Sequence, residues 1–202
     1  MTGGSNMEKT MRQDARVAKS KRRMRDALLR LMRQKPLADV TVTELCSEAS
    51  VNRNTFYAHY ASPIDVLDEL MGELGVRNAH ALAVTRRRGS IAWLTELCAN
   101  IQDEKEAYGA LLSTPEGRSY IEQEIASAYR LVMDSTAERI RNDRGHADVF
   151  AFATGGSIAL IEHWLSEGAV RPPEEMALLI NRLCKQGMAG WFDREATGAE
   201  GR

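Results

Sequence analysis

Side chains that can hydrogen-bond to bases and phosphates are concentrated between residues 53 and 59. Arg53, Asn54 and Thr55 are followed by Tyr57 and His59. In proteins that bind nucleic acid, Arg and Asn form paired hydrogen bonds with guanine and adenine, while Thr and Tyr often reach phosphate oxygens. A solvated helix face is the simpler alternative, but no protein core requires this mixture of donors. The residue types therefore favour contact with DNA.

Two short helices joined by a tight turn are expected to hold these side chains. Thr41 and Glu44 have the spacing of a capping box, which satisfies backbone N–H groups at the start of a helix. Asn52 is a good N-cap for the second helix, in which Phe56 and Tyr60 share one face and would bury against the first helix. The apolar face of the first helix consists of Val42, Leu45, Cys46 and Ala49. This is the layout of a helix-turn-helix, although helical hairpins also occur in folds of many other kinds.

The segment from about residue 17 to about residue 70 resembles the N-terminal domain of the TetR family of transcriptional regulators. The positions that agree in order and spacing are Thr41-Val42-x-Glu44-Leu45, Ala49-x-Val51, Thr55-Phe56-Tyr57-x-His59-Tyr60, Ser62 and Val66-Leu67. The resemblance implies an all-helical homodimer whose N-terminal domains bind a DNA operator. It also implies that the C-terminal domains hold the dimer together and, in most members, take up a small-molecule effector.

Two positions depart from the family's pattern. The turn between the short helices usually has Gly, where this chain has Ser50, so a left-handed backbone there would carry a modest cost. The family usually has Lys after the Ser that precedes the next helix, and that residue here is Pro63. Proline suits the first turn of a helix, but it removes an ammonium that would bind phosphate, so that contact is not carried over.

The candidate DNA contacts divide into two groups. Arg53, Asn54 and Thr55 lie near the start of the second short helix and are expected to reach base edges. The side chains expected to contact phosphates are Thr43, Tyr57, His59, Lys19, Lys21 and Arg22. Residues 1–62 contain 12 Lys and Arg against 6 Asp and Glu, a balance of +6, whereas the remainder has 15 against 22, a balance of −7. A basic N-terminal part attracts phosphates, and the acidic remainder is kept off the duplex.

The chain of 202 residues is long enough for two units with separate cores. We expect a flexible basic arm over 1–16, a helix-turn-helix domain over 17–62, a helical dimerisation and effector-response domain over 63–194, and a flexible tail over 195–202. Helical periodicity without persistent strand-like alternation predicts an all-α fold. Helices are expected, besides the two short ones, at 17–34, 63–86, 90–103, 104–112, 115–142, 146–168 and 173–192. No apolar stretch is long enough for a membrane span and no signal peptide is visible, so a cytoplasmic location is expected.

The last two expected helices carry more apolar residues than one stripe requires, which predicts contacts on two sides. The residues expected at a dimer interface are Ile158, Ile161, Trp164, Leu165, Leu179, Leu183 and Trp191. The alternative is that they form only the core of a single subunit. The motifs Thr154-Gly155-Gly156-Ser157-Ile158, Trp164-Leu165 and Pro173-Glu174-Glu175-Met176 resemble a C-terminal class similar to the dihydroxyacetone-operon regulators of Gram-positive bacteria.

No pattern in the sequence indicates catalysis, a cofactor or a metal site. The three cysteines form no Cys-x-x-Cys pair, and neither a nucleophile elbow nor a phosphate-binding glycine loop is present. His163 and Glu167 are four residues apart and could share a metal, but an exposed ion pair or a dimer contact is the simpler interpretation. The chain is therefore expected not to be an enzyme.

The sequence predicts a homodimeric, sequence-specific DNA-binding regulator. We expect a repressor that a small-molecule effector releases from a pseudo-palindromic operator. Aromatic and apolar residues of the middle helices could line an effector pocket, but the same spacing is typical of a core, so none is assigned to such a site. One alternative is a co-regulator that acts through protein contacts without operator binding of its own. Another is a structural helical interaction protein, which would leave the basic N-terminal part unexplained.

Overall fold

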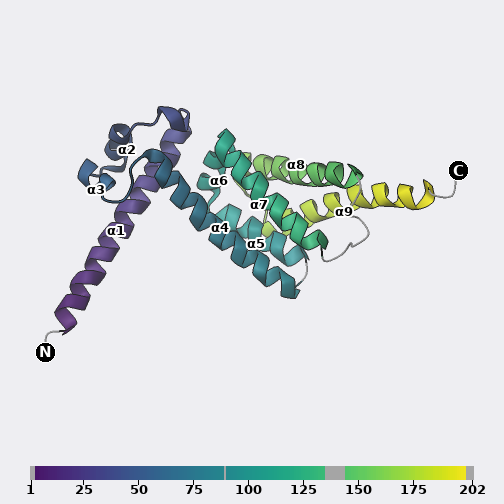
Figure 1. Cartoon of the computed structure of the whole chain (residues 1–202), viewed down its shortest axis with the longest axis horizontal. Coiled ribbons are helices and arrows are strands. Elements are labelled where there is room, and N and C mark those ends of the chain that lie inside the picture. The colour runs from purple at the N-terminus through teal and green to yellow at the C-terminus, as the bar shows by residue number, and fades with distance from the viewer. Residues whose placement is uncertain (1–2, 89, 135–143, 199–202) are drawn as a thin grey trace. The chain divides into compact units, whose positions relative to one another are not determined.

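Helices make up all the regular structure in the ranges that the computed structural model describes, which are residues 3–88, 90–134 and 144–198. The elements labelled in Figure 1 are α1 (Gly3–Met32), α2 (Val42–Ala49), α3 (Arg53–Tyr57), α4 (Pro63–Arg88), α5 (Ser90–Asp103), α6 (Lys105–Leu112), α7 (Pro115–Asp134), α8 (Arg144–Ser166) and α9 (Pro173–Gly198). A single 3-10 turn, Leu37–Asp39, lies between α1 and α2. The predicted all-α fold is confirmed.

The chain divides into two compact units, Met1–Leu74 and Gly75–Arg202. The boundary expected from the sequence lies at Ser62, so the two divisions differ by the first turns of α4. Those turns carry Leu67 and Leu70, which are only 2% exposed. Their burial in the first unit is the physical reason why the contacts place the start of α4 there.

The core of the first unit is built from apolar residues that recur at helical spacing. α1 packs against α2, and α2 packs against α3. The largest of the fully buried side chains of the unit are Met24, Leu28, Leu45, Phe56, Leu67, Leu70 and Leu74. Because α3 has only five residues, it depends on this packing rather than on its own hydrogen bonds, since isolated helices of such length are unstable in water.

The second unit is a bundle in which α9 lies along α5, while α8 packs against α6, α7 and α9. Its buried side chains include Tyr108, whose hydroxyl donates a hydrogen bond to the amide oxygen of Asn78 at 3.2 Å. In Figure 1 the last turns of α9 extend beyond the other helices of this unit. Within the described residues, no helix is both long and apolar enough to cross a membrane.

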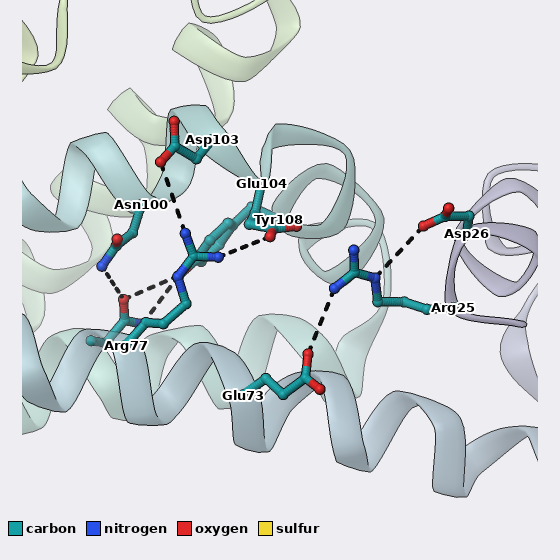
Figure 2. A network of polar contacts seen from close by, with 9 residues as sticks. Arg25, Asp26, Glu73, Arg77, Asn100, Asp103, Glu104 and Tyr108 are labelled. Atoms are coloured by element: carbon teal, nitrogen blue, oxygen red, sulfur yellow. Dashed lines mark hydrogen bonds and ion pairs between the residues drawn. The ribbon is translucent and has the colours of Figure 1, made fainter. Parts of the chain in front are cut away.

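Charged side chains link helices within each unit, as Figure 2 shows. In the first unit, Arg25 of α1 lies 3.6 Å from a carboxylate oxygen of Glu73 in α4. In the second unit, Arg77 of α4 donates a hydrogen bond to Glu104 at 2.8 Å and lies 3.8 Å from Asp103. The two halves of α4 are therefore each held by ion pairs to their own unit.

Among the described residues, three helix ends differ from the expected ones by three residues or more. α1 begins at Gly3, so it includes most of the segment expected to form a flexible arm over 1–16. That segment contains no proline and many good helix formers, which allows the helix to continue. α3 ends at Tyr57 rather than at residue 60. α9 continues to Gly198, past the expected end at residue 192 and into the expected tail, and it stops at the residue type that most often ends helices.

Candidate nucleic-acid interface

The start of α2 is fixed by the predicted capping box, which is confirmed. The amide of Glu44 donates to the hydroxyl of Thr41 at 3.2 Å, and the amide of Thr41 donates to the Glu44 carboxylate at 3.0 Å. Lys35 adds a hydrogen bond to the same carboxylate at 2.7 Å. The bonds from Lys35 and then Thr41 lower the pKa of Glu44 from 4.5 to about 2. The first turn of α2 is thus a firm support for the residues that it exposes.

The turn between α2 and α3 is left-handed at the position where the family usually has glycine. Ser50 adopts φ 50° and ψ 49°, the left-handed conformation that glycine normally supplies. The amide of Val51 donates to the carbonyl of Cys46 at 2.9 Å, which closes the turn. The side chain of Asn52 then accepts a hydrogen bond from the amide of Asn54 at 2.8 Å, so the predicted N-cap of α3 is also confirmed.

Replacing Ser50 with glycine is expected to stabilise the first unit by about 1 kcal/mol, because glycine adopts the left-handed backbone without a Cβ clash. Urea unfolding followed by circular dichroism measures this change. Ser47→Gly is the matched control, since it makes the same substitution at an exposed position inside α2, where the helical backbone should lose about 0.5 kcal/mol. If both variants lost stability alike, the left-handed turn would not be a source of strain.

Aromatic packing decides which face of α3 stays in solvent. Phe56 is 0% exposed, and Tyr60 just beyond the helix is 7% exposed. The rings of Phe56 and Tyr60 lie 5.7 Å apart, and those of Phe56 and Tyr57 lie 5.5 Å apart in an edge-to-face arrangement. Burial of Phe56 and Tyr60 anchors one side of α3 and turns the other side outward.

The outward face of α3 carries the side chains predicted to contact DNA. Arg53, Asn54 and Tyr57 are exposed, and Thr55 and His59 are partly exposed. All five side chains come from one short stretch of the chain. Within the described part of the chain, no carboxylate forms an ion pair with Arg53.

Thr43 on α2 joins this surface through Arg53. One terminal nitrogen of the Arg53 guanidinium donates a hydrogen bond to the Thr43 hydroxyl at 2.5 Å. Burial raises the pKa of the Cys46 thiol, and the charge of Arg53 partly offsets that rise. The guanidinium of Arg53 therefore lies along α2. The two short helices present one joint surface, as the sequence suggests.

Lys21, one of the predicted phosphate contacts, is already engaged within the first unit. Its ammonium lies 2.7 Å from a carboxylate oxygen of Glu69 and 5.5 Å from the ring centre of Tyr60. The Tyr60 hydroxyl donates a hydrogen bond to the same carboxylate. Burial raises the pKa of Glu69, but the bonds from Lys21 and Tyr60 outweigh it, and the pKa lies below its usual value. Lys21 thus helps to hold α4 on α1.

Lys19 and Arg22 are the predicted phosphate contacts of α1 that remain available. Both are exposed, and neither forms an ion pair with another described residue. Arg30, further along α1, is by contrast paired with Glu48 at 2.6 Å. Ion pairing therefore separates the cations of the first unit into those that support its fold and those that are free to meet an external anion.

The residues predicted at a dimer interface do not all reach the surface. Ile158, Ile161 and Trp164 are at most 2% exposed within a single chain, so they belong to the core of the second unit. For these three residues the core alternative is the correct one, because a side chain already covered by its own subunit offers no surface to a partner. Leu165 and Leu179 are partly exposed, Leu183 is 47% exposed, and the side chain of Trp191 lies outside the described residues.

Other apolar side chains of α8 and α9 take the outward positions. Phe152 of α8 is 63% exposed and Leu178 of α9 is 39% exposed. The exposed positions of α8 also include Gly155, Gly156 and Ala159, whose spacing matches that of Phe152 on one helix face. The apolar excess of these helices was visible in the sequence, but the side that faces outward was not.

Three cysteines and one His–Glu pair are the other candidate groups that the sequence raised. Cys46, Cys98 and Cys184 are buried thiols without a disulfide. His163 and Glu167 are exposed, with 3.5 Å between the ring nitrogen and a carboxylate oxygen, which is the expected spacing of a surface pair. Among the described residues, no group of three or more His, Cys, Asp and Glu side chains could hold a metal ion.

Residues 91–186 match the family model for the "Transcriptional regulator C-terminal region" of the TetR class. Among solved structures, a TetR transcriptional regulator from Streptococcus agalactiae is 20% identical, with 87% of this chain and 98% of that chain covered and a TM-score of 0.61. No curated protein sequence matches the chain.

Two further structures are similar to this chain. The dihydroxyacetone kinase operon activator DhaS is 12% identical, with 83% of this chain and 95% of that chain covered and a TM-score of 0.53. The TetR-family repressor FadR from Thermus thermophilus, determined in complex with lauroyl-CoA, is 18% identical, with 83% and 94% covered and a TM-score of 0.51. At these identities the likeness concerns the fold.

The fold and the family match agree with each other. The N-terminal unit holds a helix-turn-helix and the C-terminal unit a helical bundle, an architecture shared with the solved TetR-family structures. Residues 91–186 are similar to the C-terminal region of TetR-class transcriptional regulators, and solved TetR-family structures share the fold of the chain. The resemblance stated from the sequence is confirmed, and a dihydroxyacetone-operon regulator is among the similar structures. The family and these structures are regulators rather than enzymes.

Proposed function

We propose that a homodimer of this chain binds a pseudo-palindromic DNA operator in the cytoplasm and represses transcription. The observation that carries the proposal is the outward polar face of α3. Phe56 and Tyr60 are buried, whereas Arg53, Asn54 and Tyr57 are uncovered. In a helix-turn-helix the second helix enters the major groove and its N-terminal residues contact base edges. That role accounts for an Arg-Asn-Thr sequence at the start of α3.

The individual contacts follow from exposure and charge. Arg53, Asn54 and Thr55 are assigned to base edges, because they form the first turn of α3, the helix proposed to enter the major groove. Thr43, Tyr57, His59, Lys19 and Arg22 are assigned to phosphates, because they flank that turn or lie on the basic face of α1. Lys21 is left out of the second group, since its ammonium already pairs with Glu69.

Selection of bound sequences from a random duplex pool tests the proposal. Purified protein should enrich a pseudo-palindrome whose half-sites lie about one helical turn of DNA apart or somewhat more. Binding should weaken steeply as the salt concentration rises, because phosphate contacts release counterions. If no motif emerged at low or at physiological salt, the proposal would be wrong. A co-regulator that acts through protein contacts would then be the better interpretation.

Exposed apolar residues of α8 and α9 support the dimer. Phe152, Leu178 and Leu183 are exposed, whereas Ile158, Ile161 and Trp164 of α8 are buried. Gly155 and Gly156 of α8 carry no side chain, so a second helix can approach α8 closely at these positions. A second copy of this surface is the occupant that twofold operator binding requires.

Replacing Leu183 with Asp is expected to shift the protein from dimer to monomer, because a carboxylate would be buried without a partner at the interface. Analytical ultracentrifugation measures the change, and the dimer dissociation constant should rise at least tenfold. Val76→Asp is the control, since it places the same charge at an apolar position of α4 that is 73% exposed. If Leu183→Asp and Val76→Asp both kept the dimer dissociation constant of the wild type, the interface would lie elsewhere.

We also propose that a small-molecule effector binds the second unit. The Thermus thermophilus regulator with a similar fold was determined with lauroyl-CoA, which supports a small-molecule effector for the second unit of this chain. Lauroyl-CoA is therefore the first probe, and the readout is operator affinity with and without it. An effector that prefers the DNA-free conformation must weaken operator binding by the same factor by which the operator weakens its own binding.

A further inference from the structure

We infer that Thr43 is a positioning residue that sets Arg53 for reading a guanine. The inference rests on the proposed operator binding and changes the role of Thr43 from a phosphate contact to a determinant of sequence preference. Its starting point is the hydrogen bond of 2.5 Å from the Arg53 guanidinium to the Thr43 hydroxyl. This contact joins the two helices of the helix-turn-helix through their exposed side chains.

The position of Arg53 has no explanation in the stability of α3. Arg53 is the first residue of the helix, where acidic side chains are favoured and a cation is unfavourable. A free arginine there would also sample many rotamers, since its side chain carries considerable conformational entropy. The Thr43 hydroxyl restricts these rotamers before DNA arrives, and such preorganisation raises affinity by lowering the cost of ordering on binding.

The anchor is neutral, which distinguishes Arg53 from the other engaged cations of the first unit. Lys21, Arg30 and Lys35 are each held by a carboxylate. A carboxylate partner would compensate the charge of Arg53 and repel DNA, whereas a hydroxyl fixes the direction of the side chain and leaves its full charge. Arg53 therefore remains an exposed cation whose charge is not compensated and whose guanidinium is held at a defined position beside α2.

The support beneath the anchor is rigid. Thr43 is the second residue of α2, directly before Glu44, whose capping box with Thr41 fixes the first turn. Its own side chain is β-branched and has few rotamers in a helix. The chain of contacts thus runs from the capping box to Thr43 and from Thr43 to Arg53.

The geometry leaves enough donors for a base. A guanidinium has five N–H donors, and the bond to Thr43 uses one of them. The remaining four include a pair that can contact both acceptors of guanine in the major groove, the commonest specific arginine contact. Once DNA covers the surface, the bond to Thr43 is removed from water and becomes stronger than in the free protein.

Sequence selection with four proteins tests the inference: wild type, Thr43→Val, Thr43→Ser and Arg53→Ala. Valine keeps the shape and β-branching of threonine but lacks the hydroxyl, and serine keeps the hydroxyl. Thr43→Val should lower discrimination for guanine about 2- to 10-fold at the same base pair that Arg53→Ala relaxes, as expected for loss of one hydrogen bond. Thr43→Ser should retain most of that discrimination.

The possible outcomes separate the inference from the proposed function. If the wild type enriched no motif, the operator binding and the role of Thr43 would both be refuted. A wild-type motif that Thr43→Val reproduced in full would overturn the positioning role alone. Equal weakening on all sequences by Thr43→Val would also overturn it, because that result describes a phosphate contact or a damaged α2. Melting curves of the four free proteins identify any damage to α2.

Discussion

Replacing Phe56 with alanine is expected to unfold the helix-turn-helix and abolish DNA binding while the second unit stays folded. Phe56 is 0% exposed and packs against Tyr60. Truncation of a buried phenylalanine costs about 3–5 kcal/mol, which is a large part of the stability of a unit of this size. α3 is most affected, because its five residues depend on this side chain for their position.

Two optical signals distinguish the units in this experiment. All three tryptophans, Trp93, Trp164 and Trp191, belong to the second unit, so tryptophan fluorescence reports on that unit alone. Circular dichroism reports on the helices of both units. Phe56→Ala should therefore move part of the circular dichroism transition to lower urea while the fluorescence transition stays in place.

The neighbouring aromatic residue provides the control. Tyr57 is 59% exposed, and Tyr57→Ala should leave both unfolding transitions nearly unchanged while it weakens DNA binding. An unchanged circular dichroism transition in Phe56→Ala would show that Phe56 is not part of a cooperative core. A fluorescence transition that moved by the same amount would show that the two units unfold as one.

Local sequence patterns predicted the helix-turn-helix formed by α2 and α3 well. The capping box of Thr41 and Glu44 and the N-cap Asn52 depend on residues two to three positions apart. Side-chain and backbone geometry over such distances is set mainly by residue type. The exposure of Arg53 and the burial of Phe56 followed from the same spacing. This part of the site could therefore be derived from the sequence.

Contacts between distant segments were not predictable in the same way. Lys21 was expected to bind phosphate as one of several basic residues on α1, but its ammonium pairs with Glu69, 48 positions later. No periodicity relates two residues on different helices at that separation. Which basic residue is compensated, and which stays free, becomes visible only once α1 and α4 are packed.

The residues of the dimer interface could not be predicted from the sequence either. Hydrophobic periodicity identifies the apolar positions of α8, but it does not distinguish the core of one subunit from the surface between two. Ile161 and Trp164 therefore looked equivalent to Phe152 in the sequence, although the first two are buried and the third is 63% exposed. When a helix is apolar on more than one side, the packing of its neighbours decides which side remains open.

Replacing Arg53 with alanine is expected to weaken operator binding and to remove the preference for one base pair in each half-site. A paired arginine–guanine contact contributes about 1–3 kcal/mol of discrimination, equivalent to roughly 5- to 150-fold per half-site. The dimer carries the contact twice, so the loss on a full operator should exceed the loss on an isolated half-site. Competition binding against operators altered at single positions measures both quantities.

Arg22→Ala is the matched comparison, because it removes the same charge from an exposed position of α1. If Arg22 contacts phosphate, its loss should weaken binding to all sequences alike and reduce the slope of log affinity against log salt by about one per contact. Arg53→Ala should instead change the ranking of sequences. An Arg53→Ala protein that kept the wild-type ranking would show that α3 does not read bases through this residue, and the outward face of α3 would then serve only to hold the DNA backbone.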